Sequence, residues 1–242
     1  MWLFSKNILV KDSGLLDGFC DYHCHLLPGV DDGVQDMEQT FHILDLLESL
    51  GVNELWMTPH IMEDYPNEPD RLKELFSNVK NLFSGNIKLN LAAENMLDGI
   101  FIKRLQNNNL LCFGNKDLLI ETSYYMPPMN MQLVIDKIKE KGYRPILAHP
   151  ERYEYMRQDD YLHWKHDGVL LQLNLPSLVG AYGPGVQSKA EWLLNNGMYD
   201  CSGTDCHSAD QMDFFLDSPI NKRMLKKALR LKQFTESSQQ TI

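Results

Sequence analysis

Residues 117–149 read DLLIETSYYMPPMNMQLVIDKIKEKGYRPILAH, and this one segment contains a complete strand, helix and strand pattern. Leu118-Leu119-Ile120 and Ile146-Leu147-Ala148 are continuous apolar runs, which are typical of strands covered on both faces. Between these runs, apolar residues recur at helical spacing: Met131, Val134, Ile135 and Ile138. Gly142 then marks the end of the predicted helix. Two buried strands joined by a helix predict a parallel sheet with a right-handed crossover.

The same alternation continues along the rest of the chain. Further apolar segments of strand length cover residues 19–25, 54–60, 88–94, 169–174 and 198–205. Helical stripes are predicted around Phe41, Leu44 and Leu47, from Leu72 to Phe83, and over residues 188–196. Together with the strands at 117–121 and 145–149, these segments predict one α/β domain spanning residues 1–242, because no Pro/Gly/Ser-rich linker divides the chain.

The number of strands indicates the architecture. Seven strand-and-helix units favour a closed barrel, one strand short of the eightfold form. An open doubly wound sheet is the alternative, but the G-x-G-x-x-G turn typical of that fold does not follow the first predicted strand.

Composition places the chain among ordinary globular proteins. Of its 242 residues, 43% are hydrophobic and 23% are charged, which is enough apolar material to form a sizeable core and to exclude disorder. The formal net charge of −10 argues against a nucleic-acid partner, because such a partner usually requires a basic face. It leaves anionic substrates open, since bound metal ions can reverse the local charge.

The cysteines and the N-terminus indicate a cytoplasmic protein. The five Cys are an odd number, and residues 1–6 lack the basic-then-apolar order of a secretion signal. No apolar run approaches the roughly 20 residues that span a bilayer. We therefore expect a reducing, cytoplasmic location and no transmembrane segment.

The C-terminal ends of the predicted strands carry residues that can bind metals. These residues are His23, His25, His60, Glu94, Glu121, His149, Asp205 and His207. In a βα barrel, such strand ends share one rim, where active sites are built. Five of the eight His are therefore expected to converge with three carboxylates, which predicts a metal site.

The donor types indicate the metal and the reaction. Imidazoles and carboxylates suit manganese, iron or zinc in a catalytic role, with magnesium as a further alternative. His23 and His25 can hold one ion together, because residues i and i+2 of a strand point to the same face. Eight or nine donors exceed the needs of one ion, so we expect two or three. Such a site can activate water and clamp both oxygens of a displacement at phosphorus, which predicts phosphate-ester hydrolysis.

Two further features lie beside this rim. Residues 26–33, LLPGVDDG, form a predicted turn, and either Asp31 or Asp32 could also supply an oxygen ligand. Arg152 lies three residues after His149. A surface Arg is the ordinary interpretation of Arg152, but its guanidinium fork could instead hold a phosphate.

Residues 23–33, HCHLLPGVDDG, resemble the opening motif of the PHP (polymerase and histidinol phosphatase) proteins. The branch they are most similar to is the CpsB/CapC type, the manganese-dependent protein-tyrosine phosphatases of bacterial capsule and exopolysaccharide systems. Later motifs of this family fit the segments at 58–60 (TPH), 148–153 (AHPERY), 174–180 with Lys189-Ala190, and 203–207 (GTDCH). The resemblance covers about residues 19 to 210.

The resemblance implies a fold and a ligand set. The family fold is a distorted seven-stranded (β/α)7 TIM-like barrel. By motif, the first ion would be held by His23, His25, Glu94 and Asp205. The second ion would be held by Glu94, Glu121 and His149, and the third by Asp32, His60 and His207. The motif thus selects Asp32 over Asp31, and Arg152 matches a phosphate-contacting Arg.

The resemblance also implies an activity. The expected reaction is hydrolysis of phosphotyrosine by a metal-activated water, on the Tyr-rich tail of a bacterial tyrosine kinase in capsule or exopolysaccharide regulation. Arg152 would stabilise the phosphoryl oxygens, and His60 or His207 could protonate the leaving phenolate. Tyr124 and Tyr125 either offer an apolar landing surface for the substrate or simply pack within their loop.

Three segments depart from the family pattern or extend beyond it. Residues 208–221 contain no Lys or Arg, although such proteins often carry a further basic residue after the last motif His. Residues 1–18 precede the usual start of the family and could form an added strand or arm. The polar tail at 235–242 is expected to be frayed.

Other functional classes were weighed against this interpretation. A cysteine phosphatase needs a Cys-x5-Arg loop, and no Cys in the chain has an Arg six positions later. Another PHP activity, such as histidinol-phosphate hydrolysis, would use the same metals with a different pocket. A non-catalytic barrel that serves as a binding module is the remaining class, and the full set of expected ligands argues against it.

Overall fold

The computed structural model describes residues 6–231, in which helices alternate with strands. The strands are β1 (Asn7–Leu9), β2 (Cys20–Cys24), β3 (Glu54–Met57), β4 (His60–Ile61), β5 (Lys88–Leu91), β6 (Glu94–Met96), β7 (Asp117–Glu121), β8 (Arg144–Ala148), β9 (Leu170–Asn174), β10 (Cys201–Gly203) and β11 (Pro219–Asn221). The α-helices are α1 (Met37–Ser49), α2 (Pro69–Leu82), α3 (Phe101–Gln106), α4 (Met131–Glu140), α5 (Gln158–His166), α6 (Pro184–Asn195), α7 (Ala209–Asp217) and α8 (Lys222–Ala228). Each predicted strand segment contains an observed strand, and α1, α2, α4 and α6 lie on the predicted helical stripes.

The segment at 117–149 folds as its sequence pattern predicts. All five residues of β7 are buried, and β7 pairs in parallel with β8. Between them, α4 buries the predicted stripe residues Met131, Ile135 and Ile138. Gly142 follows the helix with a φ of 84°, a left-handed conformation that glycine adopts without strain.

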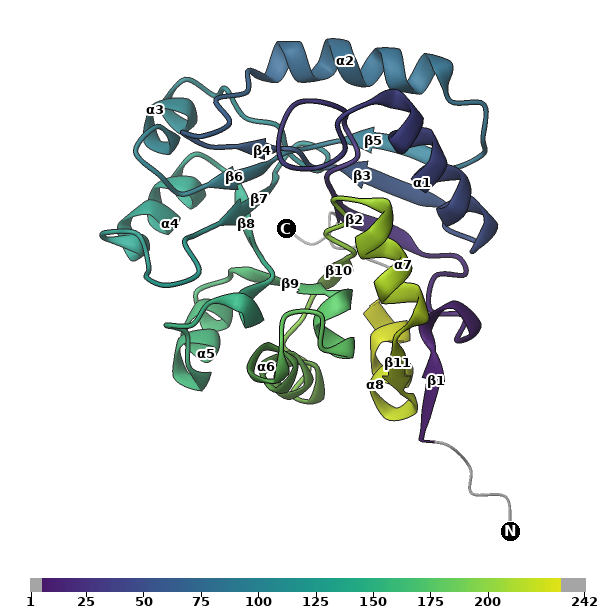
Figure 1. The fold of residues 1–242 in the computed structure, drawn as a ribbon. Helices are drawn as coiled ribbons and strands as arrows, with labels where there is room; N and C mark the ends of the chain where they lie inside the picture. Colours follow the sequence, from purple (N-terminus) through teal and green to yellow (C-terminus); the bar gives the residue numbers. More distant parts are fainter. Residues whose placement is uncertain (1–5, 232–242) are drawn as a thin grey trace.

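Most strands form two parallel sheets that curl around a common centre, with helices on the outside (Figure 1). The larger sheet has the order β10-β9-β8-β7-β6-β4, and the smaller has the order β2-β3-β5. Only Thr58 and Pro59 separate β3 from β4, and only Ala92 and Ala93 separate β5 from β6. Two of the predicted strands therefore pass from the smaller sheet into the larger one.

The two sheets also meet where β2 lies beside β10. An isolated parallel bridge joins Cys24 to Cys206, and the backbone amide of His25 donates to the Cys206 carbonyl at 2.8 Å. The buried Asp21 carboxylate strengthens this seam, since it accepts hydrogen bonds from the Thr204 backbone amide and hydroxyl at 2.9 and 2.6 Å. The pairing thus gives two curled sheets joined at a seam, in place of one continuous ladder of seven strands.

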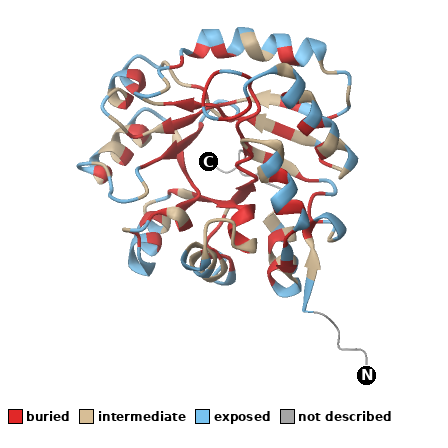
Figure 2. Ribbon diagram, in the orientation of Figure 1, coloured by how far each residue is buried: buried red, intermediate tan, exposed pale blue. Residues whose placement is uncertain are grey.

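Alternate residues of the strands face two separate apolar clusters. On β7, Leu118 and Ile120 join the large core between the sheets and the helices, whereas Leu119 joins a small cluster on the opposite face. The members of this small cluster are Ala92, Phe113, Leu119, Ile146, Ala148 and Cys201. Glu121 lies two residues beyond Leu119 and so shares its face. Figure 2 shows the strands of the larger sheet almost wholly buried and the helices exposed on their outer sides.

The segment before the first predicted strand does contain a strand. Within residues 1–18, β1 pairs antiparallel with β11, so that Ile8 lies opposite Ile220. The predicted frayed tail at 235–242 lies outside the described residues. Among residues 6–231, no helix combines the length and apolar character that crossing a membrane requires.

Candidate metal centre

The nine predicted metal ligands gather at one end of the curled sheets. Asp32 lies in the loop between β2 and α1, and each of the others lies at or close to the end of a parallel strand; together they are His23, His25, Asp32, His60, Glu94, Glu121, His149, Asp205 and His207. Seven of the nine are buried. The two others, Asp32 and His207, leave 54% and 23% of their side chains exposed. The centre therefore has a buried side and an open side.

The buried side consists of His23, His25, Glu94 and Asp205, which we call the inner group. Their potential ligand atoms all lie within 4.8 Å of one another. His23 Nε2 lies 3.1 Å from Glu94 Oε2 and 3.3 Å from Asp205 Oδ1. His25 Nε2 lies 3.1 Å from His23 Nε2. Two imidazoles and two carboxylates thus point at one spot, as ligands of a shared ion do.

Hydrogen bonds at Nδ1 orient the two imidazoles of the inner group. His25 Nδ1 donates to the buried carboxylate of Asp31 at 2.8 Å. His23 Nδ1 lies 2.6 Å from Gln172 Oε1, and Gln172 Nε2 donates to the Tyr22 carbonyl, which fixes the orientation of the Gln172 amide. Both histidines therefore carry a hydrogen on Nδ1 and turn Nε2 toward the group, as outer partners of metal ligands usually arrange.

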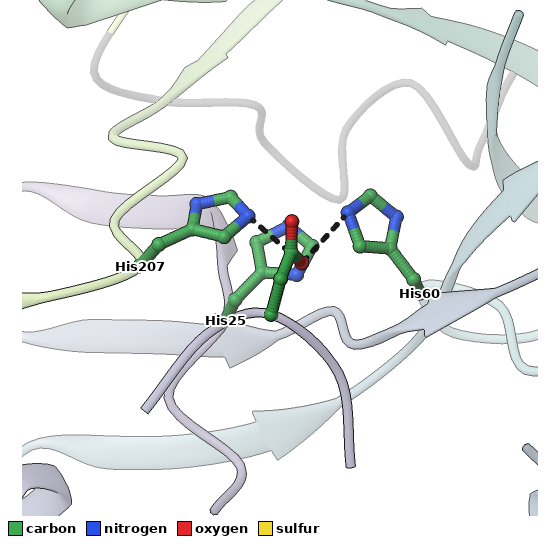
Figure 3. Close-up of side chains that lie close together, drawn as sticks. His25, His60 and His207 are labelled. Atoms are coloured by element: carbon green, nitrogen blue, oxygen red, sulfur yellow. Dashed lines mark ion pairs between the residues drawn. The ribbon is translucent and has the colours of Figure 1, made fainter. Parts of the chain in front are cut away.

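The open side consists of Asp32, His60 and His207 beside His25, and we call these first three residues the outer group. The four potential ligand atoms again lie within 4.8 Å of one another. His60 Nε2 and His207 Nε2 reach Asp32 Oδ1 at 3.5 and 3.6 Å (Figure 3). His207 Nδ1 donates to the Asp205 carbonyl at 2.8 Å, because a carbonyl can only accept. Its Nε2 is therefore the free atom.

A third cluster consists of His60, Glu94 and Glu121. The ligand set predicted for the second ion had His149 in place of His60. His60 Nδ1 lies 2.8 Å from Glu121 Oε1 and 3.2 Å from Glu94 Oε2, so His60 faces this cluster as well as the outer group. His149, the predicted third member, places Nε2 2.8 Å from Glu94 Oε1 and 4.0 Å from Glu121 Oε2. Both histidines thus contact Glu94, which is also a member of the inner group.

These residues fit bound cations. Within residues 6–231, His60 Nδ1 lies 2.8 Å from Glu121 Oε1 and 3.2 Å from Glu94 Oε2, yet none of these three buried atoms makes a hydrogen bond of good geometry. A buried carboxylate oxygen without a hydrogen bond is costly, and a divalent cation would satisfy it. The mixture of imidazole and carboxylate matches manganese, iron or zinc in a catalytic site.

Two histidines of the cluster differ in charge at neutral pH. Burial works against the charged imidazole of His23, but Glu94 and Asp205 outweigh it and raise the pKa of His23 to about 9. Burial and the neighbouring charge of His25 instead lower the pKa of His207 to about 4. At neutral pH and without ions, His23 therefore carries a second hydrogen and His207 does not.

Backbone strain marks two of the predicted ligands. His149 and Asp205 have φ values of 33° and 53°, a left-handed conformation that residues other than glycine rarely adopt. Such strain persists where the surrounding structure holds it, and it is common at functional sites.

Gly203 allows the close approach of β10 and β2, since a Cβ at this position would collide with the His23 side chain.

Arg152 lies against the inner group. Its Nη1 donates to Asp205 Oδ2 at 2.6 Å, and its guanidinium carbon lies 4.4 Å from the Tyr124 ring centre and 4.3 Å from that of Tyr182. Asn174, at the end of β9, also donates to Asp205 Oδ2, at 2.9 Å. The contact between Arg152 and a predicted ligand was not foreseen from the sequence, and neither was the ring of Tyr182.

A curled parallel sheet with imidazole and carboxylate clusters at the C-terminal ends of its strands defines a metal-binding α/β protein of the barrel-like kind. A family model described as capsular polysaccharide synthesis, CpsB/CapC, matches residues 19–229. The chain belongs to this CpsB/CapC family.

Two curated relatives share most of their length with the chain. CapC of Staphylococcus aureus, named provisionally as a tyrosine-protein phosphatase, is 27% identical over 219 residues, which are 85% of this chain and 84% of CapC. YwqE of Bacillus subtilis, named a tyrosine-protein phosphatase, is 27% identical over 201 residues, which are 80% of this chain and 79% of YwqE.

A solved structure supports the fold. It comes from crystallographic work on YwqE of Bacillus subtilis and CpsB of Streptococcus pneumoniae, described there as metal-dependent tyrosine phosphatases. It aligns with a TM-score of 0.74 at 24% identity, over 90% of this chain and 88% of the other. The chain therefore has the mixed α/β fold of that structure, with a curled parallel sheet.

Proposed function

We propose that the chain is a metal-dependent protein-tyrosine phosphatase, which hydrolyses phosphotyrosine with a metal-activated water. The observation that carries this proposal is the convergence of buried imidazoles and carboxylates beside Arg152 at one strand-end rim. The family and the names of both curated relatives support the same activity. No cysteine nucleophile is required, since Cys24 and Cys206 are buried and burial raises the pKa of each thiol above its ordinary value.

The proposed architecture is a distorted seven-stranded barrel. In this description, β3 with β4 and β5 with β6 each count as one strand, and the bridge between Cys24 and Cys206 closes the ring beside β10. The arrangement would place the inner group at the mouth of the barrel, above the small apolar cluster around Leu119.

The proposed ligand sets follow the family motif. The first ion would be held by the inner group, the second by Glu94, Glu121 and His149, and the third by the outer group. The position of His60 beside Glu94 and Glu121 suggests that it also borders the second ion. When bound, two or three divalent ions, most readily manganese, would supply Lewis acidity and lower the pKa of water at the site.

The side chains of the protein would perform the remaining steps. Arg152, which contacts two aromatic rings and donates to Asp205, is held in place and would present its remaining N–H groups to the phosphoryl oxygens. Burial and His25 work against a charged His60, but Glu94 and Glu121 raise its pKa, so His60 would hold a proton for the leaving phenolate only while it is not bound to an ion. His207, with its lowered pKa, would act as a neutral imidazole.

The proposed substrate is a phosphotyrosine in a protein, on the Tyr-rich tail of a bacterial tyrosine kinase, in the cytoplasm and in control of capsule or exopolysaccharide synthesis. The loop after β7 would receive it. Tyr124 covers Arg152, whereas Tyr125, Met126 and Met129 are 71%, 66% and 87% exposed, so these three are free to contact the residues that flank the phosphotyrosine.

The test compares two substrates on the manganese-loaded protein. Phosphate release is measured with a phosphotyrosine peptide and, separately, with histidinol phosphate. The proposal expects kcat/KM to be much higher for the peptide. A preference for histidinol phosphate would instead make the chain a small-molecule phosphoesterase, and no turnover of either would make it a binding module.

A further inference from the structure

Tyr182 lies at the edge of the centre without having been predicted from the sequence. It follows the 3-10 helix η3 (Leu175–Val179) and precedes α6. Its ring centre lies 4.3 Å from the guanidinium carbon of Arg152, and the ring centre of Tyr124 lies 4.4 Å from the same carbon. The side chain is half-buried, and its hydroxyl lies beside Asn174, whose amide also bonds the predicted ligand Asp205.

Two amides surround the Tyr182 hydroxyl, and other bonds fix the orientation of both. The Asn174 side chain lies 2.9 Å from Asp205 Oδ2, and an ionised carboxylate can only accept, so the atom facing it is the amide nitrogen Nδ2. Gln211 Oε1 accepts the backbone N–H of His207 at 2.6 Å, so the other end of this amide is the nitrogen Nε2. Neither amide can be turned round without losing a strong hydrogen bond.

Both nitrogens donate to the same oxygen. Asn174 Nδ2 lies 3.1 Å from Tyr182 Oη, and Gln211 Nε2 lies 3.3 Å from it. The phenol oxygen is therefore an acceptor twice over, and its own hydrogen has to point elsewhere. Among residues 6–231 no side chain or carbonyl accepts that hydrogen. Burial raises the pKa of Tyr182 to about 12, so the hydroxyl keeps its hydrogen at neutral pH.

We propose that Tyr182 is a further catalytic residue, which donates this hydrogen bond to a non-bridging oxygen of the substrate phosphoryl group beside Arg152. The proposal rests on the proposed phosphatase function. A phosphoryl group held next to Asp205 and Arg152 would bring an anionic acceptor to the hydroxyl, whose two amide donors leave it only the role of donor. The Tyr182 ring meanwhile fixes the plane of Arg152, so one side chain orients one phosphate donor and supplies another.

Tyr182→Phe isolates the hydroxyl, because it keeps the ring over Arg152. With the manganese-loaded protein, we expect kcat/KM to fall roughly tenfold for both p-nitrophenyl phosphate and phenyl phosphate, as loss of a hydrogen bond to a charged group predicts. The inhibition constant of inorganic phosphate should rise by a similar factor. Manganese affinity should stay unchanged. Tyr143→Phe, far from the rim on the turn before β8, is the matched control and should match wild type.

Three results would overturn the proposal. A loss confined to phenyl phosphate, which has the poorer leaving group, would make Tyr182 a proton donor to the leaving oxygen. A loss of manganese affinity would show that the hydroxyl acts through Asn174 and Gln211 on the ligands. Unchanged kinetics would remove any role of the hydroxyl.

The same variant separates this proposal from the proposed function. If the loaded wild-type protein turned over no phosphate ester, the phosphatase function would fail by itself. Calorimetric titration with inorganic phosphate would then decide the role of Tyr182, since equal affinity in wild type and Tyr182→Phe contradicts it and weaker affinity in the variant supports it.

Discussion

The inner and outer groups of the metal centre contain the same kinds of side chain in very different settings. His23, Glu94 and Asp205 of the inner group are buried beneath the rim, whereas Asp32 of the outer group is 54% exposed. The inner histidine His23 is oriented by a buried glutamine, and Asp205 is bonded by both Arg152 and Asn174. From this contrast we infer that the inner group is preorganised to bind an ion, whereas the outer group is open to solvent and to substrate.

The adjacent residues Asp31 and Asp32 display the contrast most clearly. Asp31 is buried and accepts from His25 Nδ1 and from the backbone amides of His60 and Gly33. Although burial opposes its charge, the bonded His25 lowers the pKa of Asp31 to about 2. Asp31 thus orients a ligand of the inner group, and Asp32, turned the other way, faces His60 and His207.

The largest expected effect comes from the inner group. Glu94 contacts His23, His60 and His149. Glu94→Gln should therefore remove a carboxylate that is shared between the proposed ion positions. We expect kcat on an aryl phosphate to fall on the order of 10³-fold, since charge stabilisation by metal ions is worth several kcal/mol. Excess manganese should not restore it. Glu74→Gln, on the exposed side of α2, is the control, and a Glu94 variant as active as this control would contradict the assignment.

A smaller and reversible effect is expected from the outer group. Asp32→Asn should lower activity about 100-fold at limiting manganese, equivalent to about 3 kcal/mol. Because Asp32 is exposed, added manganese should recover much of the loss, as a titration of rate against metal concentration would show. Failure of any manganese concentration to raise the rate would mean that the two groups do not differ as described.

The pH dependence of metal binding should also distinguish the two sides. His23, with its pKa raised to about 9, is protonated at pH 7 without metal, so an ion bound by the inner group has to displace a proton. Affinity should therefore rise up to about tenfold per pH unit between pH 7 and about 9 and then level off. His207, with its pKa lowered to about 4, has no proton to release over that range.

Calorimetry in buffers of different ionisation enthalpy measures this proton release directly. Proton release is expected on filling the first site, and on filling the outer site it should come from His60, whose pKa is also raised, and not from His207. Equal affinity at pH 7 and pH 9 would contradict the protonated state of the inner histidine.

The smallest effect is expected from a residue that lies between two ligands. Cys24 is buried, and burial raises the pKa of its thiol well above the ordinary value, so it is no nucleophile. Cys24→Ala should leave kcat nearly unchanged and lower the free energy of unfolding by about 1 kcal/mol, as measured by urea denaturation. Loss of turnover in a variant that still binds manganese normally would revive a cysteine mechanism.

Much of the fold could be predicted because buried strands have a simple signature. The runs at 118–120 and 146–148 are continuous and apolar, and the helix between them shows a regular stripe. The helix α5 was missed because only Tyr161 and Trp164 of its nine residues are buried, which is too little for a visible period. The pairing of β1 with β11 joins segments from opposite ends of the chain, and no local pattern indicates it.

The site was predictable as a set of residues, but its internal arrangement was not. Imidazoles and carboxylates at strand ends identify the candidate ligands by type, and the structure brings these side chains close together. Asp31 and Asp32 are chemically identical neighbours. Only the fold determines that Asp31 bonds His25 while Asp32 is exposed to solvent. Tyr182 shares no spacing with the ligands, so its place over Arg152 had no signal in the sequence.

The most direct test of the central claim is a manganese titration of metal-stripped protein that records bound metal and phosphotyrosine-peptide turnover in the same samples. The account predicts no turnover in the stripped protein, with activity rising as two to three ions bind and vanishing again when a chelator is added. Turnover by the stripped protein at the rate of the loaded one would contradict it.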